Sequence, residues 1–214
     1  MRANKYIELI NSSNSDDYIK KITNCGWTFE MNKDEVLTLE KKIREYHLAD
    51  KNYTAFALTC LQFDKQNFLA DYSSLKPTSG QAYSQILSLL KKVSNGNFFP
   101  SNILEKYDIK EKRIILCFFH SYKNFTVILD ARQINDTNIF WAVNQALLAS
   151  GSKKLFCKME DIDSEDPEDF YSISFVSPEI YKKAVENDLI PHLSSADNFF
   201  SEQTKWSFVN YDLF

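Results

Sequence analysis

The chain has 214 residues, of which 44% are hydrophobic and 25% are charged, and its formal net charge is −4. This balance is typical of a folded globular protein and excludes wholesale disorder. The four glycines, Gly26, Gly80, Gly96 and Gly151, lie far apart in the sequence. Loops that bind phosphate need several glycines close together, so the sequence excludes a P-loop and a dinucleotide-binding fingerprint.

Residues 1–17 contain no apolar run as long as a signal peptide core or a membrane span. We therefore expect a cytoplasmic protein that does not insert into a membrane. The cysteines lie mostly in apolar segments, without a C-x-x-C pair or a Cys–His spacing typical of zinc sites. We expect buried free thiols, with Cys117 and Cys157 at neighbouring core positions, and no metal or other cofactor.

Residues 1–97 are predicted to form a helical region. The strongest helix covers 32–49, where Asn32 and Glu35 have the spacing of a capping box. Another covers 79–96, where apolar residues recur at helical spacing and predict one buried face made of Tyr83, Ile86, Leu87, Leu90 and Val93. Shorter helices are expected at 5–10 and 15–26. The segment 53–63 is compatible with either a buried helix or a strand.

Residues 101–214 are predicted to form an α+β region, and the two regions together are compatible with one compact domain. Apolar runs rich in β-branched and aromatic residues predict a hairpin. The expected elements are strands 113–120 and 124–131, helix 137–150, strands 153–159 and 169–176, helix 178–189 and strand 204–212. From residue 124 onward this order is the ferredoxin-like β-α-β-β-α-β arrangement, preceded by one extra strand. We expect one mostly antiparallel sheet with both helices on the same face.

The segment between the two middle strands is strongly acidic. Seven of the ten residues from 160 to 169 are carboxylates, and none is Lys or Arg: Glu160, Asp161, Asp163, Glu165, Asp166, Glu168 and Asp169. Residues 101–214 contain 12 Lys+Arg and 18 Asp+Glu, so this segment accounts for their whole excess of negative charge. It is compatible with a solvated loop, a cation site or a docking patch for a basic partner.

A calcium loop is the most specific of these interpretations. Asp161, Asp163 and Glu165 have the spacing of the first three ligands of an EF-hand loop. An EF-hand also requires glycine at the sixth position and glutamate at the twelfth, where this chain has Asp166 and Ser172. The predicted flanking elements are strands rather than helices. The pattern therefore disfavours calcium and leaves a solvated loop, the ordinary interpretation, and a docking patch, the functional one.

Candidate catalytic residues are few. The three histidines, His47, His120 and His192, form no i,i+4 pair, and none stands beside a recognisable nucleophile. Cys117 and His120 are expected on opposite faces of an extended strand. Asp130 ends a predicted strand, a position that often presents functional side chains but also suits an ordinary turn. A site assembled from scattered residues, with His120 or Asp130 in a hydrolase, is the enzymatic alternative.

Nucleic-acid binding through the sheet is a further possibility that the sequence disfavours. Phe125, Phe156, Tyr171 and Trp206 lie on predicted strands and have rings that stack on bases in RRM-like sheets. The RNP1 pattern is missing, and a net charge of −4 with a pI near 5.5 opposes binding to phosphates. We expect these aromatic side chains to fill a core and expect no nucleic-acid partner.

No motif in the chain specifies a reaction. The sequence favours a non-enzymatic cytoplasmic protein that docks a basic protein partner through residues 160–169. An immunity-type protein that neutralises a basic toxin, or another inhibitor, fits this description, because such proteins need shape and charge rather than catalytic motifs.

Overall fold

The computed structural model describes residues 15–27, 32–35, 37–38, 41, 68–69, 82–131, 138–160 and 171–190. These residues form an α+β fold, the class that the sequence predicts. The helices are α2 (Ser15–Asn24), α5 (Ala82–Val93), α6 (Asn138–Ala149) and α7 (Pro178–Glu186). The strands are β1 (Phe68–Leu69), β2 (Ser101–Asp108), β3 (Arg113–His120), β4 (Lys123–Asp130), β5 (Leu155–Glu160) and β6 (Tyr171–Val176).

The strands form two antiparallel sheets, in the orders β2-β3-β4 and β1-β6-β5. The prediction of one continuous sheet is therefore wrong for the described strands, and no ferredoxin-like order is present among them. A split β-α-β unit needs β4 in the same sheet as β5 and β6. Here β6 already pairs with β1 on one side and β5 on the other, so it has no free edge for β4.

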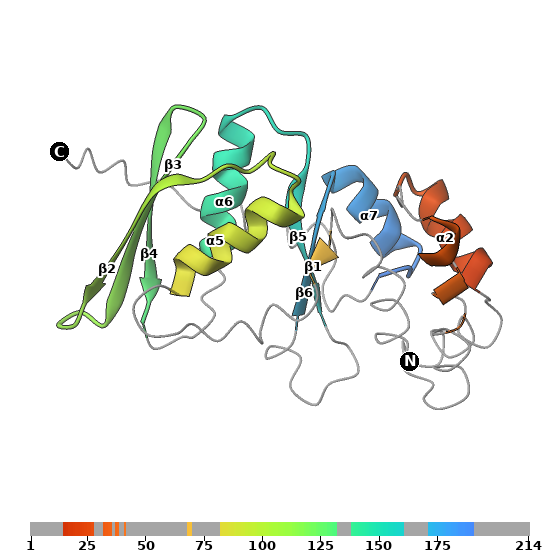
Figure 1. The fold of residues 1–214 in the computed structure, drawn as a ribbon, viewed down its shortest axis with the longest axis horizontal. Helices are drawn as coiled ribbons and strands as arrows, with labels where there is room; N and C mark the ends of the chain where they lie inside the picture. Colours follow the sequence, from red (N-terminus) through yellow and green to blue (C-terminus); the bar gives the residue numbers. More distant parts are fainter. Residues whose placement is uncertain are drawn as a thin grey trace.

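The sheets and helices alternate in layers (Figure 1). Helices α5 and α6 lie between the two sheets, and α7 and α2 lie on the far side of the β1-β6-β5 sheet. The predicted position of both C-terminal helices on one face is therefore wrong. Five consecutive residues of β6, from Ser172 to Val176, are buried, because helices cover both faces of this strand.

The central position of α6 explains its composition. Its sequence, NIFWAVNQALLA, is apolar around most of its circumference, which is typical of a helix buried over most of its surface. Its buried residues are Ile139, Phe140, Ala142, Val143, Asn144, Ala146 and Leu147. The helix ends before Gly151, which has a φ of 81°, and Ser152 N–H donates to the Leu147 carbonyl. This C-terminal stop is the one that the sequence predicts.

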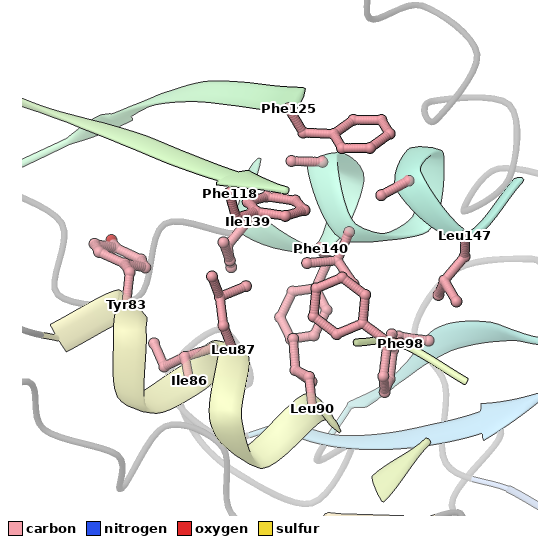
Figure 2. Close-up of a cluster of buried hydrophobic side chains, with 14 of the residues drawn as sticks. Tyr83, Ile86, Leu87, Leu90, Phe98, Phe118, Phe125, Ile139, Phe140 and Leu147 are labelled. Carbon is pink, nitrogen blue, oxygen red and sulfur yellow. The ribbon is translucent and has the colours of Figure 1, made fainter. Parts of the chain in front are cut away.

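The main core lies between α5, α6 and the two sheets (Figure 2). The five residues predicted to form one face of α5, from Tyr83 to Val93, are all buried in it. Phe98 contacts Phe118 of one sheet edge-to-face, with ring centroids 5.7 Å apart, and Phe156 of the other, at 6.4 Å. Helix α5, from the predicted helical region, thus shares a core with the α+β region. The domain boundaries at residues 97 and 101 remain a prediction.

The predicted hairpin at 113–131 is confirmed. Strands β3 and β4 pair in register from Arg113 with Asp130 to His120 with Lys123. The burial of β3 alternates at every residue, so one face of the sheet packs on the core and the other faces outward. Only Ser121 and Tyr122 connect the strands, and both have positive φ, 47° and 65°. This two-residue turn has the left-handed backbone that tight hairpins require.

Two strands were not predicted. In β2, Ile103 and Leu104 are adjacent and the other side chains are mostly polar, so the segment lacks a clear period of two. The strand forms at the edge of the sheet by pairing with β3, with an irregularity between Ser101 and Leu104. Strand β1 has only two residues and exists through its pairing with β6. Both strands therefore depend on tertiary pairing rather than on local sequence.

Several predicted helix ends are confirmed. Asn32 and Glu35 exchange hydrogen bonds of 3.1 Å and 3.0 Å, which is the expected capping box. Gly26 follows α2 with a φ of 103°. Ser177 caps α7 by accepting from Ile180 N–H at 3.2 Å, and Pro178 occupies the first turn. Within the described helices, none is long and apolar enough to cross a membrane.

Candidate functional site

His120 is the predicted candidate around which the described structure gathers the most polar contacts. It ends β3 on the inward face, and only 3% of its surface is exposed. Its Nδ1 lies 3.2 Å from Phe99 N, which precedes β2. Its Nε2 lies 3.3 Å from the hydroxyls of both Ser150, which follows α6, and Ser121, in the hairpin turn. One imidazole thus joins three separate segments, and we call this arrangement the His120 junction.

Two contacts favour the tautomer of His120 that carries its proton on Nε2. Phe99 N–H lies 3.2 Å from Nδ1 and donates to it when Nδ1 has no proton, whereas the Phe99 carbonyl, at 3.4 Å, would accept from a protonated Nδ1. The Ser150 hydroxyl donates to the Leu147 carbonyl at 2.7 Å, which leaves its oxygen to accept from Nε2–H. A serine nucleophile needs a histidine nitrogen that accepts its proton. In this junction the histidine donates to serine, so the contacts are those of a structural connection.

Burial lowers the pKa of His120, because desolvation disfavours the charged imidazolium, although the Phe99 carbonyl, 3.4 Å from Nδ1, partly opposes this as an acceptor for the protonated ring. Protonation of Nδ1 would also remove the acceptor to which Phe99 N–H now donates. The neutral form is therefore favoured in the folded protein.

Asp130, the second catalytic candidate, lies at the other end of the same hairpin. It pairs with Arg113, whereas His120 pairs with Lys123. Seven residues of extended strand separate the two ends, which is about 23 Å at roughly 3.3 Å per residue. The structure therefore does not bring His120 and Asp130 into one site. Arg113 instead forms an ion pair with Asp108, at 3.2 Å from Nε to Oδ2.

Asp108 has the local contacts of a turn residue. The pKa of its carboxyl is lowered first by the backbone N–H of Glu111 and also by Arg113. The hydrogen bond from Glu111 N–H to Asp108 Oδ1, at 3.2 Å, closes the turn that connects β2 and β3. Across the described ranges, no group of three or more His, Cys, Asp or Glu has the arrangement of a metal site.

The acidic segment lies almost entirely outside the described residues. Glu160 is the last residue of β5 and pairs with Tyr171, the first residue of β6. Residues 161–169, and with them the other six predicted partner-binding carboxylates, are not described, and neither are His47 and His192. The segment connects two neighbouring antiparallel strands, β5 and β6, which confirms its predicted position between the two middle strands.

Two of the aromatic residues considered for base stacking are core residues. Phe125 and Phe156 are 7% and 0% exposed. Phe125 stacks on Phe118 at 5.5 Å, and Phe156 contacts Phe175 at 4.9 Å. The expectation that they fill a core is confirmed. The side chain of Tyr171 and all of Trp206 fall outside the part of the chain that can be described.

The predicted pair of buried thiols is only half confirmed. Cys157 is fully buried, and burial raises the pKa of its thiol. Cys117 is half-buried on the outward face of the other sheet, 3.4 Å from the Thr126 hydroxyl. The two are not neighbours, because β3 and β5 belong to different sheets. Cys117 and His120 do lie on opposite faces of β3, as expected.

Sequence reasoning missed the partners of His120. Phe99, Ser121 and Ser150 are ordinary residues at element ends, and nothing local indicates that they converge. The segments that contain these residues share one visible feature of composition: residues 84–104, 114–129 and 138–159 contain lysines and no Asp or Glu. Comparison of the chain with protein-family models, with curated proteins and with solved structures gave no match.

Proposed function

We propose that this protein is a non-enzymatic binding protein whose acidic segment, residues 160–169, docks a basic protein partner. The observation that carries the proposal is the presence of seven carboxylates and no Lys or Arg in ten consecutive residues. A cluster of like charges creates a local potential that attracts a partner of opposite sign and speeds the encounter. An immunity-type or inhibitor protein is a function of this kind.

The attachment of the segment supports this proposal. Glu160 and Tyr171 are paired, so both ends of the connection are joined to one end of the β5–β6 pair. This pair is firmly packed: Phe156, Cys157, Ile173, Ser174 and Phe175 are at most 1% exposed. A charged connection whose two ends are fixed on paired, well-packed strands supports docking at this end of the β5–β6 pair.

The hydrolase-like alternative has less support. Its two named residues, His120 and Asp130, lie at opposite ends of the β3–β4 hairpin. The Ser150 hydroxyl donates to the Leu147 carbonyl, so in its contact with His120 it accepts from Nε2 and is not activated as a nucleophile. A nucleophile and its base must instead lie within hydrogen-bond reach with the base able to accept.

Affinity capture tests the proposal. The wild-type protein and a variant with Asp161→Asn, Asp163→Asn, Glu165→Gln and Asp166→Asn are immobilised in parallel and exposed to lysate of the source cells. The proposal predicts a basic protein that the wild type retains, that the variant loses and that salt releases. Capture of the same proteins by both forms would contradict it. A small molecule that co-purifies with both forms would favour the enzymatic alternative.

Calcium needs a separate measurement, because a cation site would use the same carboxylates. Docking of a basic partner predicts that calcium does not change the melting temperature of either form. A calcium site predicts a melting temperature that rises with added calcium in the wild type and not in the variant, since ligands that bind only the folded state stabilise it.

A further inference from the structure

The three segments that meet at the His120 junction are free of acidic residues. Residues 84–104, 114–129 and 138–159 contain no Asp or Glu. Phe99 N–H donates to His120 Nδ1, and Ser150 lies within hydrogen-bond distance of Nε2, so these contacts hold the segments together. The charged residues of these segments that are nearest in the chain to Phe99, His120 and Ser150 are lysines, four of them exposed and Lys91 half-buried: Lys91, Lys92, Lys123, Lys153 and Lys154. These segments therefore contribute only positive side-chain charge to a protein of net charge −4.

Two aromatic side chains are exposed beside these lysines. Phe99 is 55% exposed, and the Nζ of Lys91 lies 3.5 Å from the centroid of its ring. Tyr122, in the hairpin turn, is 96% exposed. Aromatic side chains surrounded by positive charge are typical anchors of protein interfaces. We call Lys91, Lys92, Lys123, Lys153, Phe99 and Tyr122 the basic surface.

The backbone at Tyr122 gives an independent reason to regard this surface as a contact site. Tyr122 has a φ of 65°, and Ser121 before it has a φ of 47°. Two-residue turns of this kind favour Asn and Gly, because a larger side chain is strained at positive φ. The nearly complete exposure of Tyr122 means that its ring gains little from packing within its own chain. A strained, exposed aromatic residue that contributes little to folding is a candidate for contact with another molecule.

We propose that the basic surface docks a short acidic segment of another protein. Charge complementarity selects an acidic occupant, and the exposed rings supply apolar contacts for its side chains. The surface contains lysines but no arginine, whose planar fork is the usual group for bidentate phosphate contacts. A short peptide carboxylate needs no such fork.

The position of the acidic segment disfavours a long polyanion here. Strand β5 begins at Leu155, next to the basic surface, and ends at Glu160, where the acidic segment begins. The five residue steps from Leu155 to Glu160 span about 17 Å of extended strand. A nucleic acid that extends along β5 would approach Glu160, the first of the seven carboxylates in the sequence, whereas a short acidic peptide fits within the basic surface. The two ends of β5 therefore adjoin stretches of sequence of opposite charge.

Binding of a labelled twelve-residue peptide of alternating Glu and Leu, measured by fluorescence anisotropy, tests this proposal. In the test variant Lys92, Lys123 and Lys153 are replaced by Glu. A matched control changes three exposed lysines elsewhere to Glu, Lys20, Lys106 and Lys110, which alters the net charge equally. We expect the peptide Kd to rise about tenfold or more in the test variant and much less in the control, because interface charges act locally.

Tyr122→Asn separates binding from folding. Asparagine tolerates positive φ, so this variant is expected to melt at or above the wild-type temperature while binding the peptide more weakly. Equal peptide affinity in wild type, test variant and control would overturn the proposal. So would tighter binding of a labelled twelve-nucleotide oligothymidylate than of the peptide, or self-association of the protein that the three test substitutions abolish.

Discussion

Asn144 of α6 pairs with the backbone of Phe156 in β5 as a neighbouring strand would. Its side-chain amide donates to the Phe156 carbonyl and accepts from the Phe156 N–H, both at 2.8 Å. Among the described strands, β5 lies at the edge of its sheet, so the Phe156 backbone groups that point away from β6 have no strand beside them. Both residues are completely buried, and unpaired backbone groups there would be costly. A single asparagine thus closes the edge against the central helix.

Asn144→Ala should lower the free energy of unfolding by about 2–4 kcal/mol, because it leaves a buried N–H and a buried C=O without partners. Leu148→Ala, in the same helix at a position 49% exposed, is the control and should change stability by less than about 1 kcal/mol. Urea unfolding of the three proteins measures the difference. Similar losses in both variants would mean that the Asn144 bonds add little.

The adjacent phenylalanines Phe98 and Phe99 provide a matched pair for the core. Phe98 is fully buried between Phe118 and Phe156, so Phe98→Ala should cost about 3–5 kcal/mol. Phe99 is 55% exposed, and Phe99→Ala should cost less than about 1.5 kcal/mol. Chemical denaturation followed by tryptophan fluorescence compares them. Equal costs would show that Phe98 does not join the two sheets through the core.

His120 should make stability depend on pH. Its pKa is lowered in the folded state, while in the unfolded chain it is near 6.5. As pH falls through 6.5, the unfolded chain binds a proton that the folded protein does not, so the free energy of unfolding decreases until the folded pKa is reached. His120→Gln should remove this part of the decrease. Unfolding curves between pH 7.5 and 5 measure it, and an unchanged pH slope in the variant would contradict the neutral junction.

The cysteines should differ in reactivity. Cys117 is half-buried on an outward sheet face, whereas Cys157 is fully buried with a raised pKa. The pKa of Cys25 is also raised, chiefly by burial, although Lys183 partly opposes this. Because the thiolate is the reactive form, Cys117 should be alkylated by iodoacetamide before Cys25 and Cys157. Mass spectrometry of native protein after short exposures gives the order, and early labelling of Cys157 would show that β5 opens readily.

Local patterns in the sequence predicted most of the described elements correctly, while the predicted elements at 5–10, 53–63 and 204–212 lie outside the described residues. The buried face of α5, the β3–β4 hairpin and the Ser177 cap all depend on residues within one or two turns or strands. Their spacing and capping chemistry are visible in the chain, which is why these predictions are confirmed.

The arrangement of the elements was beyond local patterns. Strand β4 could pair with β6 only if one edge of β6 were free. That edge is taken by β1, a strand of only two residues that local sequence does not predict. The serines of β6 alternate with apolar residues, which predicts one exposed face, yet both serines are buried, so the sequence pattern gave no sign that helices cover both faces. The His120 junction joins residues 21 and 30 positions apart through backbone and hydroxyl groups, which have no distinctive sequence signature.

The central claim is that residues 160–169 steer a basic partner to this protein. The most direct test is the association rate of the captured partner with wild type and with the variant Asp161→Asn, Asp163→Asn, Glu165→Gln, Asp166→Asn, measured by stopped flow from low to physiological salt. We predict a fold of unchanged stability, a slower association of the variant, and a weaker dependence of its rate on salt, since exposed charges steer over about 8 Å at physiological ionic strength. Equal rates and equal salt slopes for the two proteins would contradict the claim and leave the seven carboxylates as a solvated connection.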